Sequence, residues 1–137
     1  MTQVAAIQMA SGPQTQANLL EAKRLLKQAA KQGAQLAVLP ENFAMMGMQD
    51  ADLLKIAEDP NGGPLQSFLS EQARRLGIWL VGGTIPLQTL RGDRARSSCL
   101  VFNDQGEQVA RYDKLHLFDV HVPDSDEHYA ESRVFES

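Results

Sequence analysis

The chain has 137 residues, of which 43% are hydrophobic and 22% are charged, and its formal net charge is −4. This length and composition are typical of one globular domain and exclude a disordered or fibrous chain. The single cysteine excludes a disulfide-stapled fold. No stretch approaches the roughly 20 apolar residues of a membrane span, and nucleic-acid phosphates attract clustered Lys and Arg rather than an acidic protein. We therefore expect a cytoplasmic protein with no membrane or nucleic-acid partner.

The first 40 residues alternate apolar runs with one amphipathic segment. Residues 4–10 predict a strand that ends at Ser11-Gly12-Pro13, and residues 36–39 predict a second strand that Pro40 stops. An apolar strand without polar alternation is typical of a parallel sheet that is buried on both faces. Between these strands, apolar residues recur at spacings of three and four and predict a helix over residues 15–31: Leu19, Ala22, Leu26, Ala29 and Ala30.

The middle of the chain predicts two further helices and three further strands. Asp50 is an expected cap for a short helix through Ile56, and Pro64 suits the first turn of a helix that runs to Leu76 and ends at Gly77. Strands are expected at residues 78–81, 98–102 and 108–112, with a hairpin turn over residues 103–106. This order predicts an α/β sheet. After Leu117 the sequence is polar and irregular, and no further strand or helix is expected there.

Several residues of the chain carry groups that are capable of chemistry. Glu41 directly follows an apolar strand, and Lys114 closes another, although most residues of these types at strand ends are merely solvated. Cys99 lies inside an apolar run, which favours packing over a role as nucleophile. The methionines at positions 45, 46 and 48 are interpreted either as the lining of an apolar substrate pocket or as core residues.

The three histidines, His116, His121 and His128, lie together with acidic residues in one late segment. Their spacing does not match the HExxH motif of zinc enzymes, and the acidic residues lack the order of an EF-hand loop. This segment is therefore interpreted as a solvated acidic loop, and no metal site is expected.

Three segments together resemble the nitrilase superfamily of carbon–nitrogen hydrolases. They are Val4–Met9 (VAAIQM), Gly33–Glu41 (GAQLAVLPE) and Arg111–Asp119 (RYDKLHLFD). The chain is most similar to the branch of omega-amidases and deaminated-glutathione amidases, in which the lysine motif is followed by a Val-Pro turn and a Glu-Ser, here Val122-Pro123 and Glu131-Ser132. The resemblance covers about the N-terminal half of the family's domain. It implies an α-β-β-α sandwich, of which residues 1–137 form about the first half, and we expect the domain to continue beyond Ser137.

The resemblance also implies the roles of three residues. The family uses a Glu-Lys-Cys triad supported by a second Glu, and the matching positions are Glu41 as general base, Lys114 as oxyanion stabiliser and Glu131 as the second Glu. The family's cysteine lies beyond the second Glu, and Cys99 does not match it. We therefore expect Glu41, Lys114 and Glu131 to converge at about 2.7–3.2 Å between charged atoms. The resemblance implies neither a metal nor an organic cofactor.

The resulting hypothesis is an amidase that hydrolyses a small linear carboxamide, and the resemblance implies a homo-oligomer, a homodimer, for the complete protein. The substrate stays open among an omega-amide, deaminated glutathione, an N-carbamoyl compound and a nitrile. Asp124 stands where a Gly commonly follows Val-Pro, and Ser97-Ser98 stand where the family tends to have Asn. The alternatives are a non-catalytic α/β fragment that serves assembly, and a flavodoxin-like nucleotide binder, for which a phosphate loop is missing.

Overall fold

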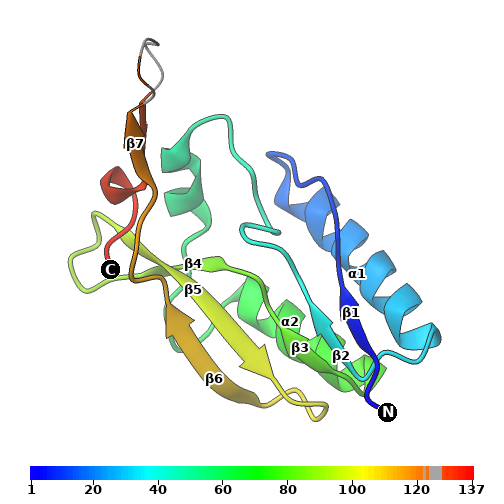
Figure 1. Cartoon of the computed structure of the whole chain (residues 1–137). Coiled ribbons are helices and arrows are strands. Elements are labelled where there is room, and N and C mark those ends of the chain that lie inside the picture. Colours follow the sequence, from blue (N-terminus) through cyan, green and yellow to red (C-terminus); the bar gives the residue numbers. More distant parts are fainter. Residues whose placement is uncertain (122, 124–127) are drawn as a thin grey trace.

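The computed structural model describes residues 1–121, 123 and 128–137, so Val122 and Asp124 of the expected Val-Pro turn lie outside the described residues. One mixed sheet carries two α-helices, and a two-stranded ribbon projects from it (Figure 1). The helices are α1 (Thr15–Lys31), η1 (Asp50–Ile56), α2 (Pro64–Leu76) and η2 (Glu131–Arg133), where η denotes a 3₁₀ helix. The strands are β1 (Val4–Ala6), β2 (Leu36–Val38), β3 (Trp79–Val81), β4 (Ile85–Gln88), β5 (Ala95–Phe102), β6 (Gln108–Asp113), β7 (Asp119–His121) and β8 (His128–Ala130).

The two long helices have the predicted bounds. Ala22, Leu26 and Ala29 on the predicted face of α1 are buried. Pro64 occupies the first turn of α2, where its missing N–H has no helical partner to lose. Gly77 ends the same helix in the left-handed region at φ 60°, which glycine adopts without steric cost. Both local signals are confirmed.

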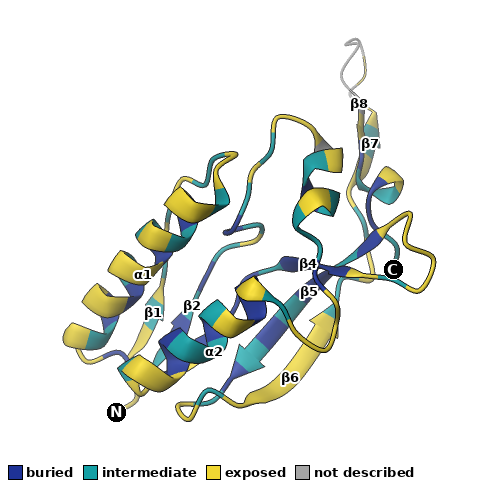
Figure 2. Ribbon diagram, turned by 180° about the vertical axis from the view of Figure 1, so that it is seen from behind, coloured by how far each residue is buried: buried dark blue, intermediate teal, exposed yellow. Residues whose placement is uncertain are grey.

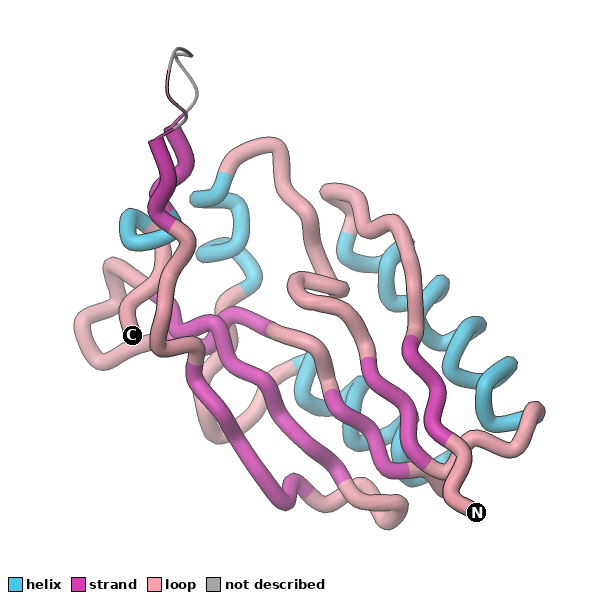
Figure 3. The backbone as a smooth tube through the Cα atoms, viewed as in Figure 1, coloured by secondary structure: helices cyan, strands magenta, loops and turns pink. Residues whose placement is uncertain are grey.

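The sheet has a parallel half and an antiparallel half (Figure 3). Strands β1, β2 and β3 pair in parallel, with Ala5 opposite Ala37 and Ala37 opposite Leu80. Strand β5 runs antiparallel to β3, β4 and β6 and connects all three. The α/β class is confirmed, while β4 was not predicted and β5 begins three residues before the predicted start.

Both long helices cover one face of the sheet, and the main core lies between them and the strands (Figure 2). Leu26 of α1 and Leu69 of α2 are fully buried against Leu80, Ile85 and Leu100 of the sheet. A layer of helices on one face of a sheet is one half of a sandwich. Within the described part of the chain, no helix is both long and apolar enough to span a bilayer.

The opposite face of the sheet carries no helix, and we call it the open face. Because side chains alternate along a strand and opposed residues point the same way, the pairing places these larger side chains there, together with alanines: Val4, Leu36, Val38, Trp79, Val81, Cys99, Val101 and Tyr112. Val4, Trp79 and Tyr112 are exposed, and the other five are half-buried. The expectation that residues 36–39 are buried on both faces was therefore wrong for Leu36 and Val38.

Besides shifts of one residue at the ends of β2, β3 and β6, three further features differ from the sequence-based expectations. Strand β1 ends at Ala6 rather than Ala10. Asp50 is the first residue of η1 and not its cap: the N-cap is Gln49, whose backbone N–H donates to Asp52 Oδ2 at 3.1 Å. The segment after Leu117 contains β7, β8 and η2, whereas the sequence predicted no regular element there. It gains this structure through the pairing of β7 with β8, which local sequence signals do not encode.

Candidate active site

Glu41, Lys114 and Glu131 meet although they are far apart in the sequence. Lys114 Nζ lies 3.0 Å from Glu41 Oε1 and 3.0 Å from Glu131 Oε2, with Glu131 Oε1 at 3.2 Å. These distances lie in the range for hydrogen bonds between charged groups. The expected convergence of the three residues is confirmed, and one ammonium group lies between two carboxylates.

Glu41 lies in a turn just beyond β2, and the backbone around it is closely packed. Leu39 N donates to Val81 O at 3.0 Å, which extends the β2–β3 pairing to the residue before Pro40. Gly83 adopts φ +59°, and a Cβ there would overlap the carbonyl oxygen of Pro40. Only glycine therefore allows this approach of the two loops.

Asn42, directly after Glu41, has the left-handed backbone conformation at φ 51°. Its N–H donates to Thr84 Oγ1 at 2.9 Å. The Glu41 side chain itself is 53% exposed, and it forms an ion pair with Lys114. The carboxylate is thus accessible to a substrate while the backbone beneath it is fixed.

Lys114 follows the last residue of β6. Its N–H donates to Ser97 O at 2.9 Å, which continues the pairing of β6 with β5. The neighbouring Asp113 accepts from Ser98 Oγ at 2.7 Å and from Arg111 Nε at 2.8 Å. Burial alone would raise the pKa of the Asp113 carboxyl, but the bonds from Arg111 and Ser98 hold this pKa below its usual range. Asp113 is therefore a charged anchor beside Lys114.

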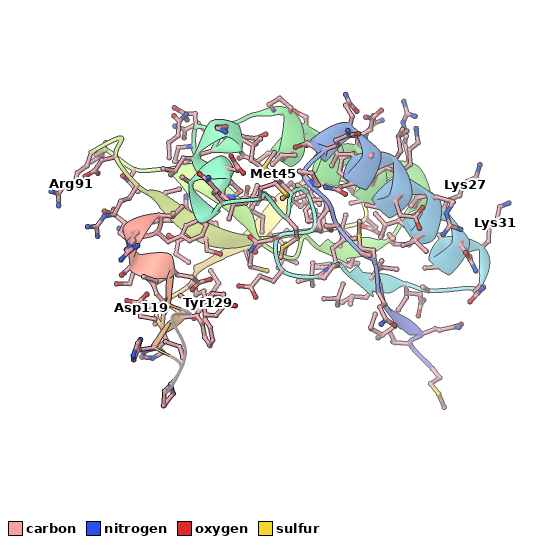
Figure 4. The ribbon with its side chains drawn as sticks, turned by 90° about the horizontal axis from the view of Figure 1, so that it is seen from above. Lys27, Lys31, Met45, Arg91, Asp119 and Tyr129 are labelled. Carbon is pink, nitrogen blue, oxygen red and sulfur yellow. The ribbon has the colours of Figure 1, made fainter. Side chains whose placement is uncertain are left out.

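Glu131 is the first residue of η2 and is attached to the segment that follows Lys114. Its Oε2 accepts the N–H of Phe118 at 2.6 Å, and its own N–H donates to Phe118 O at 3.2 Å. Next to it, Ser132 N donates to Asp119 Oδ1 at 3.0 Å. Figure 4 shows Asp119 and Tyr129 together on the projecting ribbon, at the opposite end of the molecule from Lys31.

The electrostatics of the three residues favour a protonated lysine. Burial alone would lower the pKa of Lys114, but the hydrogen bonds to Glu41 and Glu131 raise this pKa above its ordinary value. The result is a fixed ammonium group next to an accessible carboxylate. A positioned carboxylate can accept a proton as a general base, and a fixed cation can stabilise an oxyanion that develops beside it.

Cys99 is half-buried on the open face, opposite Tyr112. The sequence favours packing for Cys99, and its burial is partial because the described residues include no layer on that side of the sheet. Burial raises the pKa of the Cys99 thiol, whereas a reactive cysteine needs a lowered one.

The other candidates from the sequence do not join the site. Met46 and Met48 are exposed, and Met45 packs in a small cluster with Leu53 and Phe135, so the three methionines do not fill the main core. Among the described residues, no group of three or more His, Cys, Asp or Glu side chains is arranged to hold a metal ion.

Sequence reasoning missed two residues that support the site. Thr84 binds the turn that carries Glu41, as described above. Asn18 is buried on α1, where its Nδ2 donates to Gly12 O at 2.8 Å and to Ala44 O at 2.9 Å. An Asn on an otherwise apolar helix face is a signal that could have identified this second residue, because buried amides need hydrogen-bond partners.

Known proteins are similar to this chain in both sequence and fold. Residues 3–137 match the family model of carbon-nitrogen hydrolases. Deaminated glutathione amidase of Yersinia enterocolitica is 40% identical over 134 residues, covering 97% of this chain and 46% of that protein. The chloroplastic omega-amidase of Arabidopsis thaliana is 38% identical over 109 residues, covering 77% of this chain and 29% of that protein.

The crystal structure of the C. elegans NitFhit protein superposes with a TM-score of 0.83 at 25% identity, covering all of this chain and 34% of that one. The chain spans about half the length, or less, of the relatives it matches. The match of the family model to nearly every residue agrees with the resemblance seen in the motifs. The chain therefore belongs to the carbon–nitrogen hydrolase family of the nitrilase superfamily.

Proposed function

We propose that this chain supplies Glu41, Lys114 and Glu131 to the active site of an amidase, which hydrolyses a small linear carboxamide to a carboxylate and ammonia. The observation that carries the proposal is the Lys114 ammonium held 3.0 Å from both carboxylates. The relatives of this chain include amidases. In amide hydrolysis a general base can activate the nucleophile, and a fixed cation can stabilise the oxyanion that forms.

The proposed reaction proceeds through a thioester. Glu41 takes the proton of a cysteine thiol, and the sulfur attacks the amide carbonyl to give a tetrahedral oxyanion beside Lys114. Glu41 then gives the proton to the leaving nitrogen as the C–N bond breaks and ammonia departs. Glu41 next takes a proton from water, whose oxygen attacks the thioester carbonyl. The C–S bond then breaks, the acid product leaves as its carboxylate, and Glu41 returns its proton to the sulfur. Glu131 orients Lys114 throughout.

The nucleophile in this proposal is a cysteine that follows Glu131 in the complete domain, and not Cys99. The position of Cys99 on the open face and its raised thiol pKa support this assignment. We accordingly propose that residues 1–137 alone do not turn over amides by the covalent route, because units of catalytic residues lose most of their rate when one member is absent.

The substrate class follows from the relatives. Deaminated glutathione and omega-amides are both linear amides that also carry carboxylates, and the relatives named for these activities are 40% and 38% identical to this chain. We propose a substrate of this type. We further propose, from the resemblance, that the complete protein is a homodimer, which light scattering of the complete gene product tests. The proposed cytoplasmic location rests on the single cysteine and not on the relatives.

An assay of amide hydrolysis tests the proposed function: released ammonia is measured for the omega-amide, the N-carbamoyl compound and the nitrile, and the released amine is measured for deaminated glutathione, whose amide nitrogen belongs to a peptide. The complete gene product is assayed with an omega-amide, deaminated glutathione, an N-carbamoyl compound and a nitrile. We expect release from at least one of the first two, and a loss of about 10³-fold or more in Glu41→Gln and Lys114→Met. Glu107→Gln and Lys55→Met are matched controls, because both side chains are exposed and their partners are Asn103 and Asp52. Normal turnover in Glu41→Gln, or no turnover of any of the four substrates by the folded protein, contradicts the proposal and favours a non-catalytic module.

A further inference from the structure

We propose that Thr84 is a positioning residue for Glu41: its hydroxyl holds the strained Asn42 backbone and thereby fixes the Glu41 carboxylate against Lys114. The inference rests on the proposed function, since Glu41 is the base in that reaction. Thr84 acts on Glu41 indirectly, through the backbone of the neighbouring Asn42.

The ion pair with Lys114 is too weak to position Glu41 by itself. The Glu41 side chain is 53% exposed, and exposed ion pairs contribute only about 0–1 kcal/mol. A general base nevertheless has to stay within hydrogen-bond reach of the proton that it takes. The backbone on either side of Glu41 must therefore supply the precision.

That backbone is held in a costly conformation. Asn42 has φ 51°, and the left-handed region costs a residue other than glycine about 1–2 kcal/mol, with Asn among the more tolerant types. Such a conformation persists only where the surroundings enforce it. On the other side of Glu41, the ring of Pro40 restricts the φ angle of residue 40.

Thr84 is the group that enforces the conformation of Asn42. Its Oγ1 accepts the N–H of Asn42 at 2.9 Å and donates to Asn42 Oδ1 at 3.4 Å, so one hydroxyl binds both the backbone and the side chain of that residue. A buried or half-buried N–H that loses its acceptor costs about 1–3 kcal/mol. Removal of the Thr84 hydroxyl therefore removes the hydrogen bond that stabilises the left-handed conformation of Asn42.

Thr84 is itself firmly anchored. It directly precedes Ile85, which is 1% exposed and pairs with Ser98 of β5. The chain after Asn42 is fixed as well. Phe43 is fully buried, and its carbonyl oxygen accepts a hydrogen bond from Ser11 Oγ at 2.8 Å. Thr84 thus transmits the position of the sheet to the turn that carries Glu41.

The first measurement follows Lys114, because Glu41 raises the pKa of that residue. In the 137-residue chain, the pKa of Lys114 is read from its 13Cε resonance in the wild type, Thr84→Val, Thr84→Ser and Glu41→Gln. We expect Thr84→Val to lower this pKa by at least half as much as Glu41→Gln, and Thr84→Ser to keep the wild-type value. Thr89→Val is the matched control, since Thr89 Oγ1 also forms a hydrogen bond with the backbone, as a donor to the carbonyl of Arg94 in the β4–β5 hairpin.

The second measurement is catalytic and uses the complete gene product. Misplacement of a reacting group by about 1 Å can cost about 10²-fold, so we expect Thr84→Val to lower kcat about 10- to 100-fold with little change in KM, and Thr89→Val to change neither. Thr84→Ala replaces Thr84→Val if the latter does not fold. A wild-type Lys114 pKa in a folded Thr84→Val protein overturns the inference. If the complete protein has no amidase activity, the proposed function fails, while the Lys114 titration still decides the role of Thr84.

Discussion

Gly83→Ala should destabilise the protein much more than Gly77→Ala, although both glycines have the same backbone conformation. Their φ angles are +59° and +60°, so each alanine incurs the same left-handed penalty of about 1–2 kcal/mol. A Cβ at Gly77 meets nothing within 4 Å. A Cβ at Gly83 overlaps the carbonyl oxygen of Pro40 and lies 2.8 Å from its carbonyl carbon and 3.0 Å from Leu39 O. Because these are backbone atoms, the turn that carries Glu41 has to move.

The added cost at Gly83 is that of overpacking, about 1–3 kcal/mol, which gives about 2–5 kcal/mol for Gly83→Ala against about 1–2 kcal/mol for Gly77→Ala. Urea unfolding is followed by the fluorescence of Trp79, the single tryptophan, at two protein concentrations to detect association. Equal free energies of unfolding for the two variants, within about 0.5 kcal/mol, would refute the assignment of a close approach at Gly83.

Three further predictions concern charge, sulfur and the open face. The contacts of Lys114 raise its pKa, so their contribution to stability is complete below the ordinary lysine value of 10.5 and disappears as the pH rises through the folded-state pKa. The free energy of unfolding of Lys114→Met, measured from pH 8 to 12, should therefore lack this alkaline decrease. Curves for the wild type and Lys114→Met that run parallel over this range would contradict the prediction. Cys99→Ala should cost about 1 kcal/mol or less and leave the ammonia release of the complete gene product largely intact, whereas complete loss of turnover in a folded variant would make Cys99 the nucleophile. The 137-residue chain should self-associate through its open face, because contiguous exposed apolar surface favours association. Light scattering should show a lower mass than that of the wild type for Val38→Lys, but not for Leu90→Lys, which changes an exposed apolar residue of the β4–β5 hairpin. A monomeric wild type would exclude this interface.

Local signals were sufficient for the two long helices, α1 and α2. The bounds of α2 follow from Pro64 and Gly77, whose backbone preferences act on the turn in which they lie. The face of α1 follows from the spacing of its apolar residues, which depends only on the helical period. Neither inference needs knowledge of a distant part of the chain.

Elements that depend on a distant partner were missed. Strand β4 has four residues and contains Pro86, and it exists because Ile85 and Leu87 pair with β5 and enter the main core. The ribbon of β7 and β8 depends in the same way on pairing of Asp119 with Ala130. Short strands carry little periodicity of their own, so their stability comes from tertiary contacts.

The candidate site shows the same division. The motifs indicated Glu41, Lys114 and Glu131, but they did not indicate which groups hold these residues. Glu58, which lies outside the candidate site, shows why such partners escape prediction. It is buried because its carboxylate accepts the N–H groups of Leu65 and Gln66 at the start of α2. A carboxylate is stable at a helix N-terminus, but the sequence does not reveal that the loop returns to that helix.

One end of a single strand, β5, locates all three site residues. Ala95 exchanges backbone hydrogen bonds with Val134 and Glu136, which fixes the segment that begins at Glu131. Ser97 accepts the N–H of Lys114. Ser98 pairs with Ile85, next to the Thr84 hydroxyl that holds the Glu41 turn. The three charged groups therefore have a common rigid reference although 90 residues (131 − 41) separate the first from the last, and groups on one rigid element keep their geometry better than groups on independent loops.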